Sequence, residues 1–236
     1  MNLYQYYSEV YDLFNSDYDW CLRFIKETIR EYADNPRSLL ELACGTGNLL
    51  QHFIDEYEIS GIDISASMLA QAKKKLPNAP LFQMNMADFK LNRKFDLVIC
   101  MFDSINHLLS YEDWLKTFSC VRNHLNPGGV FMFDMNTLER LDHLSKSPGL
   151  MQEKYGVYLN VKVTKTAENV INWNIRIFKR VRDNLYELNE DNIEEISFSL
   201  EKVKQDLEML FRKVRIRTYE DGPSIVRGRN FFVCQS

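Results

Sequence analysis

Apolar residues recur with two different spacings along the chain. The spacing changes after about residue 150, which divides the chain into two kinds of segment. Between residues 38 and 135, short apolar runs alternate with longer segments in which apolar residues recur every three or four positions. The short runs are typical of buried parallel strands, and the longer segments are typical of amphipathic helices. The pattern therefore predicts an α/β protein with an open, mainly parallel sheet. The expected strands are residues 38–43, a run ending at Ile64, and residues 81–84, 95–101 and 130–135.

Capping residues predict where several helices begin and end. Ser65 stands at the N-cap position of a helix over residues 65–76, and Ser110 begins a capping-box pattern that opens a helix to about Leu125. The Asn-Pro-Gly-Gly sequence at residues 126–129 ends that helix. The other expected helices are residues 48–57 and two helices within residues 1–35, interrupted near residues 15–17.

After about residue 150 the hydrophobic period becomes two, which predicts an antiparallel insertion. Its strands are expected over residues 157–166, 170–181 and 185–198. Ser199 then caps a helix over residues 200–211, and two last strands, 214–219 and 230–234, close the sheet as a hairpin. The predicted domains are residues 1–149 with 199–236, in which residues 1–35 form a helical cap, and an insertion over residues 150–198 on the substrate side.

Composition limits the classes of protein to consider. The chain has 236 residues, 45% of them hydrophobic, enough for one principal domain with a substantial core. Its formal net charge of -4 provides no overall field that favours nucleic acid. Five cysteines without a C-x-x-C pair indicate reduced thiols rather than a disulfide framework. No leader or long apolar segment is apparent, so we expect a cytoplasmic protein without a membrane partner.

A glycine-containing turn and a carboxylate on the next strand indicate a nucleoside-binding site. The sequence Glu41-Leu-Ala-Cys-Gly-Thr-Gly47 follows the first apolar run, and Asp63 ends the second. Asp63 comes about 18 residues after Gly45, close to the roughly 20-residue interval at which an acid reaches ribose hydroxyls in doubly wound folds. The third glycine of a dinucleotide motif is replaced by Leu50, which argues against NAD.

These residues resemble the first motifs of the class I S-adenosylmethionine-dependent methyltransferases. The resemblance implies a Rossmann-like, doubly wound sheet of seven strands with helices on both faces. It also implies S-adenosyl-L-methionine as cofactor, S-adenosyl-L-homocysteine as product, and no metal. In it Asp63 binds the ribose, and Tyr11 closes over the cofactor and binds its carboxylate. The cofactor-binding residues implied are Tyr11, Trp20, Glu41, Ala43, Gly45, Gly47, Asp63, Ile64, Met68, Met86, Ala87, Asp88, Met101 and Phe102.

Two further segments resemble the subgroup that contains small-molecule and amino-sugar N-methyltransferases. They are residues 95–107, at the end of the fourth expected strand, and residues 127–134. The resemblance implies a small-molecule acceptor, methylated at nitrogen or oxygen, that meets the methyl group beside residues 101–107. If the acceptor is an ammonium, a group must accept its proton, and His107 and Asp103 are the candidates by position.

Several alternatives remain open from the sequence. The stretch 193–197 reads Ile-Glu-Glu-Ile-Ser where the subgroup often has His and Gln, so Glu194 and Glu195 are either solvated or one of them faces a cationic acceptor. Basic clusters at residues 176–182 and 212–217, with Arg227 and Arg229, raise an RNA substrate as an alternative. A noncatalytic cofactor-binding protein is another alternative. The insertion is also a candidate dimer surface.

Overall fold

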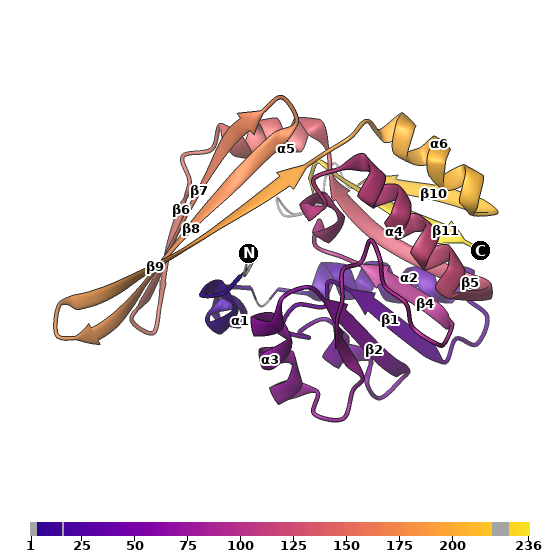
Figure 1. Cartoon of the computed structure of the whole chain (residues 1–236), viewed down its shortest axis with the longest axis horizontal. Helices are drawn as coiled ribbons and strands as arrows, with labels where there is room; N and C mark the ends of the chain where they lie inside the picture. Colours follow the sequence, from indigo (N-terminus) through magenta and orange to yellow (C-terminus); the bar gives the residue numbers. More distant parts are fainter. Residues whose placement is uncertain (1–3, 16, 219–226) are drawn as a thin grey trace.

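The computed structural model describes residues 4–15, 17–218 and 227–236, and a seven-stranded sheet lies at its centre (Figure 1). The strand order is β10-β11-β5-β4-β1-β2-β3. All neighbouring pairs are parallel except those of β11, which runs antiparallel to both β5 and β10. The strands are β1 (Ser38–Leu42), β2 (Glu58–Asp63), β3 (Leu81–Gln83), β4 (Phe95–Cys100), β5 (Leu125–Asn136), β10 (Lys213–Thr218) and β11 (Arg229–Gln235).

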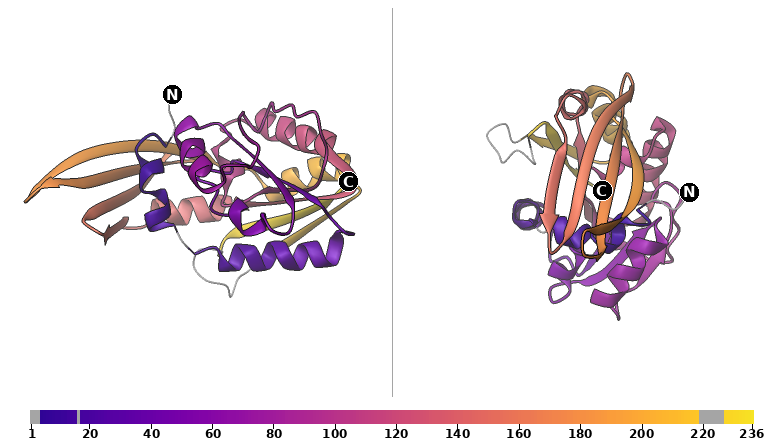
Figure 2. Two further views of the ribbon diagram at one scale, coloured as in Figure 1. Left: turned by 90° about the horizontal axis from the view of Figure 1, so that it is seen from below. Right: turned by 90° about the vertical axis from the view of Figure 1, so that its left-hand side faces the viewer.

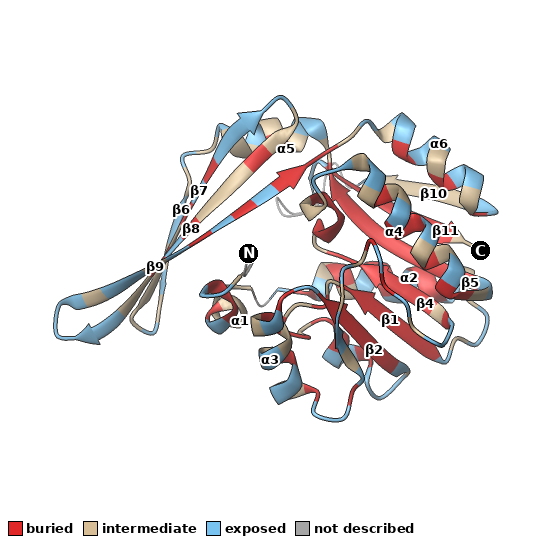
Figure 3. Cartoon of the chain, viewed as in Figure 1, coloured by how far each residue is buried: buried red, intermediate tan, exposed pale blue. Residues whose placement is uncertain are grey.

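Helices cover both faces of this sheet because its strands are apolar on both sides (Figure 2). Leu39 and Ile99 pack on one face against α2 (Asp19–Tyr32), whose buried residues include Ile25. Leu40 packs on the other face against α4 (Tyr111–His124) and α6 (Leu200–Leu210). The predicted doubly wound fold is therefore confirmed. Figure 3 shows buried residues concentrated on the central strands.

The predicted caps are present. Ser65 accepts a hydrogen bond from Met68 N at the start of α3 (Ala66–Lys75), and Ser199 accepts one from Lys202 N at the start of α6. Ser110 caps α4 in the same way through Asp113 N. Each side chain satisfies an N–H group that has no partner within its own helix.

The prediction of a helix over residues 48–57 is wrong in its length. Only η2 (Leu50–Phe53) is helical there, and it is a 3-10 helix. Gln51 N bonds to Gly47 O, four residues earlier, whereas His52 N bonds to Leu49 O, three residues earlier. Mixing of i→i−4 and i→i−3 bonds breaks the segment into turns. The N-terminal segment holds η1 (Tyr7–Glu9) and α1 (Tyr11–Phe14) before α2, as expected.

A second sheet is built from four antiparallel strands and extends away from the first (Figures 1 and 2). Its strands are β6 (Leu150–Lys154), β7 (Val157–Ala167), β8 (Val170–Arg182) and β9 (Leu185–Ile196). The period-two pattern predicted three of these strands. It missed β6 and the helix α5 (Leu138–Ser145), which Thr137 caps.

The N-terminal segment packs against the second sheet. Tyr7 and Val10 pack against Ile175 and Ile193 of the second sheet. The Asp191 side chain accepts hydrogen bonds from Tyr6 N at 3.1 Å and Tyr7 N at 2.7 Å. These contacts hold the aromatic residues of the segment over the C-terminal edge of the parallel strands.

The division into domains stays a prediction, and Tyr219, the expected end of a strand, lies outside the described residues. Within those residues, no helix has the length and apolar character needed to span a bilayer.

Replacing Ser110 with alanine should lower the free energy of unfolding by about 1 kcal/mol, because the N-cap bond to Asp113 N is lost. Urea denaturation followed by circular dichroism measures the change. Ser119→Ala is the matched control, since Ser119 is exposed on the same helix and caps nothing. Equal stability of the Ser110→Ala variant and the wild type would contradict the cap assignment.

Candidate active site

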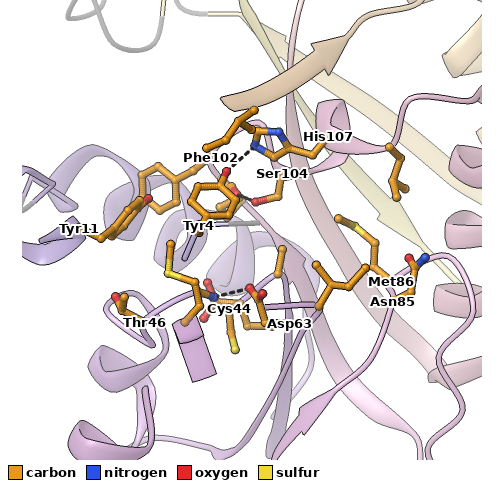
Figure 4. Close-up of a pocket in the computed structure, with 18 of the residues that line it drawn as sticks. Tyr4, Tyr11, Cys44, Thr46, Asp63, Asn85, Met86, Phe102, Ser104 and His107 are labelled. Carbon is orange, nitrogen blue, oxygen red and sulfur yellow. Dashed lines mark hydrogen bonds between the residues drawn. The ribbon is translucent and has the colours of Figure 1, made fainter. Parts of the chain in front are cut away.

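A cavity of about 560 Å³ lies at the C-terminal edge of the parallel strands, below the N-terminal segment and beside β9 (Figure 4). Its position is where open α/β sheets bind ligands, and its volume is that of a small-molecule site. It is lined by Tyr4, Tyr11, Tyr18, Glu41, Ala43, Cys44, Gly45, Thr46, Asn48, Leu49, Asp63, Ile64, Met68, Met84, Asn85, Met86, Met101, Phe102, Ser104, His107, Leu108, Leu109, Asp113, Asn172, Asn192, Ile193 and Glu194.

The turn after β1 is bent sharply towards β2. Ala43, Gly45 and Gly47 all have positive φ angles, of 52°, 53° and 75°, and glycine adopts this conformation without a steric penalty. Gly61 lets β2 approach the turn, because a Cβ there would lie 2.8 Å from Cys44 Sγ. The turn therefore depends on glycine in two places: Gly45 and Gly47 within the turn, and Gly61 on the neighbouring strand β2.

Asp63 joins the turn to the next helix. One carboxylate oxygen accepts from Gly45 N and the other from Ser65 N, each at 2.8 Å. Burial raises the pKa of this carboxyl group, while bonds from the backbone of Ser65, Gly45 and Ile64 oppose the rise. A carboxylate has about four acceptor positions, so each oxygen of Asp63 can still accept from a ligand hydroxyl.

Glu41 places a second carboxyl group in the cavity. Burial, followed by the charge of Asp63, raises its pKa well above the ordinary value. Its Oε2 is buried and has no hydrogen-bond partner among the residues that the structure describes. A buried polar atom of this kind needs a donor, and the amino group of a bound amino acid moiety would provide one. The residues present thus fit the methionine portion of S-adenosylmethionine.

The structure brings ten of the fourteen expected cofactor residues into the cavity wall. These are Tyr11, Glu41, Ala43, Gly45, Asp63, Ile64, Met68, Met86, Met101 and Phe102. Sequence reasoning missed Tyr4, Tyr18, Met84 and Asn85 among the other lining residues. Tyr4 and Tyr18 belong to an aromatic series that is also explained by packing, so the sequence carries no specific signal for them.

Four of the expected residues lie outside this cavity. Gly47 faces α3, where a Cβ would contact Leu76 and Ala72. Trp20 packs beneath the cavity wall, with its ring 5.4 Å from that of Phe102. Ala87 and Asp88 line a neighbouring surface hollow beside α4. Asn85, three residues before Asp88, reaches the cavity instead.

His107 lies in the cavity, and its hydrogen bonds fix its tautomer. Nδ1 lies 3.2 Å from the backbone carbonyl oxygen of Glu194, which can only accept, so Nδ1 carries the proton. Nε2 is then the acceptor for the Tyr4 hydroxyl at 3.1 Å (Figure 4). Burial lowers the pKa of His107, so its neutral form dominates at neutral pH.

Asp103, the other expected base, does not line the cavity. Its Oδ1 forms an ion pair with the Arg229 guanidinium at 3.1 Å, and Asn136 donates to Oδ2. Arg229 also binds Asp134 at 2.8 Å. Asp103 is therefore engaged in a buried network beneath η3 (Ser104–His107).

The same network reaches the second sheet. Asn136 donates to Glu195 Oε2 at 2.9 Å, and Asn106 donates to the backbone oxygen of Ile196 at 2.7 Å. Glu195 is 3% exposed, so the reading of this residue as solvated is wrong. Burial raises the pKa of its carboxyl group well above the usual range. Glu194 is exposed and lines the cavity at the edge of β9.

Comparison with known proteins shows a similarity to methyltransferases over part of the chain. Residues 39–129 match the family model described as a methyltransferase domain. The dTDP-3-amino-3,4,6-trideoxy-alpha-D-glucopyranose N,N-dimethyltransferase of Streptomyces venezuelae is 38% identical over 133 residues, which are 54% of this chain and 56% of that protein. The chain thus spans about half the length of the first curated relatives it matches.

Solved structures extend the similarity to nearly the whole chain. Streptomyces venezuelae DesVI superposes with a TM-score of 0.83, at 28% identity and 97% coverage of both chains. An S-adenosylmethionine-dependent methyltransferase from Clostridium acetobutylicum gives a TM-score of 0.82, at 25% identity and 98% coverage of both. The fold is therefore that of the class I S-adenosylmethionine-dependent methyltransferases, as the sequence motifs predicted. The described residues contain no cluster of His, Cys, Asp and Glu that could hold a metal ion.

Asp63→Ala should weaken binding of S-adenosylhomocysteine by about 1–3 kcal/mol, because charge-assisted hydrogen bonds to the ribose are lost. Isothermal titration calorimetry gives the affinity. Asp88→Ala is the control, since Asp88 lies outside the cavity and should leave the affinity unchanged. Unchanged affinity in Asp63→Ala would contradict the ribose assignment.

Arg229→Met should lower the free energy of unfolding by about 3–5 kcal/mol, because two buried carboxylates lose their cationic partner. Chemical denaturation at neutral pH measures the loss. In Arg217→Met, an ion pair with Glu31 is removed at the surface of the neighbouring strand, and the loss should be about 1 kcal/mol or less. Similar losses in the two variants would contradict the structural role of Arg229.

Proposed function

We propose that the chain is an S-adenosylmethionine-dependent methyltransferase that methylates an amino nitrogen of a small molecule. The observation that carries the proposal is the joined Gly45 turn and Asp63 carboxylate, which open onto the cavity at the end of the parallel strands. The methyltransferase domain match over residues 39–129 and the relatives named as amino-sugar N,N-dimethyltransferases support it.

Each part of the cofactor has matching residues in the cavity. Asp63 would accept from the ribose hydroxyls, and Glu41 would accept from the amino group of the methionine portion. Ile64 and Met68 would offer apolar contact for adenine. Tyr11 lies above the turn (Figure 4), where its hydroxyl would donate to the cofactor carboxylate. Gly47 then acts through the shape of the turn, and Trp20 acts by supporting Phe102.

The chain's own task is to align the acceptor, exclude water and remove a proton. When bound, S-adenosylmethionine supplies an electrophilic methyl group that is displaced in line from its sulfur. An ammonium has no lone pair and must lose a proton before it attacks. The Tyr4 hydroxyl can accept that proton while passing its own to Nε2 of His107, because it already donates to this nitrogen. Nitrogen then forms a bond to the methyl carbon, and sulfur keeps the electron pair.

Neutral His107 favours nitrogen over oxygen as the acceptor. An imidazole is basic enough to accept a proton from an ammonium, whereas an alcohol hydroxyl is far less acidic and would need a stronger base. Asp103 remains a second expected base, but its ion pair with Arg229 gives it a supporting role under η3. We therefore place proton removal at His107.

The two rival functions fit the structure less well. None of the arginines in the two basic clusters lines the cavity, and Arg229 is buried in the ion-pair network. An RNA substrate would need those cations at the cavity mouth. For a noncatalytic cofactor-binding protein, we would expect the space beside Met101 and His107 to be closed, but both residues line the open cavity. Dimer formation through the second sheet and a cytoplasmic location stay predictions.

The proposal predicts transfer of a labelled methyl group from S-adenosylmethionine to small amines. Calorimetry with S-adenosylhomocysteine tests the cofactor, and scintillation counting after incubation with amines and phenols tests the acceptor. Methyl uptake by amines is the expected result. Failure to bind S-adenosylhomocysteine would overturn the proposal, and uptake by phenols alone would overturn the choice of nitrogen.

The rate should depend on the protonation of His107. Because burial lowers its pKa, the acid limb of kcat should lie below the ordinary histidine value of about 6.5, with full activity above it. His107→Gln should remove this limb and lower kcat by roughly a hundredfold. His143→Gln is the control, since His143 lies on α5, outside the cavity. A wild-type acid limb that persists in His107→Gln would contradict the assignment.

A further inference from the structure

Acidic residues outnumber lysine and arginine in the wall of the cavity. Among the described residues, Glu41, Asp63, Asp113 and Glu194 line it, and no lysine or arginine does. The residues outside the described part contain no lysine or arginine either. Proteins bind phosphate groups mainly with arginine, lysine and clustered N–H donors. The wall therefore suits a cationic ligand and opposes a polyanionic one.

Glu194 contacts the proposed base through its backbone. Its backbone oxygen accepts from His107 Nδ1 at 3.2 Å, which holds this point of β9 against η3. Asn172 lies opposite Glu194 on β8, and Asn192 lies two residues away on β9. All three line the cavity. Within the described chain, the Glu194 carboxylate forms no ion pair, so its charge is available to a ligand.

Three basic residues of the second sheet already have partners. Arg176 pairs with Glu190 at 2.5 Å, Lys179 pairs with Glu9, and Lys154 donates to the backbone oxygen of Leu13 at 2.9 Å. To gain cationic partners, a diphosphate group beside the cavity would have to break such ion pairs. Otherwise its negative charge would lie near the Glu194 carboxylate with no cation to compensate it. An ammonium group would meet a carboxylate instead.

We infer that the acceptor is a free, hydroxylated amine without a nucleoside diphosphate, bound as its ammonium form by Glu194. The inference rests on the proposed function and narrows its substrate class. The Asn172 and Asn192 amides offer donors and acceptors for hydroxyl groups of the acceptor. The ammonium passes its proton through Tyr4 to His107, and the free nitrogen then takes the methyl group. In this respect the chain differs from its relatives whose names specify dTDP-linked amino sugars.

A matched pair of acceptors tests the inference. A 3-amino-3,6-dideoxyglucose is offered as its methyl glycoside and as its dTDP derivative, with labelled S-adenosylmethionine. We expect kcat/KM to be at least tenfold higher for the methyl glycoside. A preference for the dTDP derivative would overturn the inference while leaving the proposed function intact. Methylation of neither sugar by protein that binds S-adenosylhomocysteine would also overturn it. Absence of cofactor binding would remove the proposed function itself.

Variants of Glu194 test the same point independently. Glu194→Gln should raise KM for the methyl glycoside about tenfold and leave the affinity for S-adenosylhomocysteine unchanged. Glu194→Lys should shift the preference towards the dTDP derivative. Glu187→Gln is the control, because it removes the same charge from an exposed position on β9 outside the cavity. An unchanged KM in Glu194→Gln, or an equal effect in Glu187→Gln, would overturn the inference.

Discussion

The hydrogen bond from Gly45 N to Asp63 Oδ2 is the contact on which the site depends. It fixes the bent turn after β1 against the end of β2, and Ser65 N holds the other oxygen of the same carboxylate. A buried carboxylate must be satisfied by donors, so the turn and the helix N-terminus stabilise the acid that would bind a ribose. The carboxylate in turn keeps the left-handed turn in place.

A second constraint closes the opposite side of the cavity. Phe102 and Asp103 both have positive φ angles, of 61° and 52°, which non-glycine residues adopt rarely. Arg229 holds Asp103 in this conformation, and Asn136 connects Asp103 to Glu195 of the second sheet. Phe102 and His107 are thereby oriented towards the cavity. The buried charges thus help to position the cavity wall.

The sequence was sufficient for the sheet, most of its helices and many of the residues that line the cavity, because these depend on local signals. Apolar runs define β1 and β4, serine caps define α3, α4 and α6, and the glycine turn with Asp63 forms one wall of the cavity. The other features depend on contacts between distant segments. Tyr4 meets His107 across 103 residues of chain, and Arg229 meets Asp103 only after folding. No periodicity in the chain encodes such pairs, so neither the contact of Tyr4 with His107 nor the ion pair of Asp103 with Arg229 was predicted.

A crystal structure of the complex with S-adenosylhomocysteine would show directly whether Asp63 binds the ribose. We expect both ribose hydroxyls within hydrogen-bonding distance of the Asp63 carboxylate, with the bond from Gly45 N retained. The thioether sulfur should point towards the space between Tyr4 and His107. A ligand bound elsewhere, or a ribose without contact to Asp63, would contradict the account.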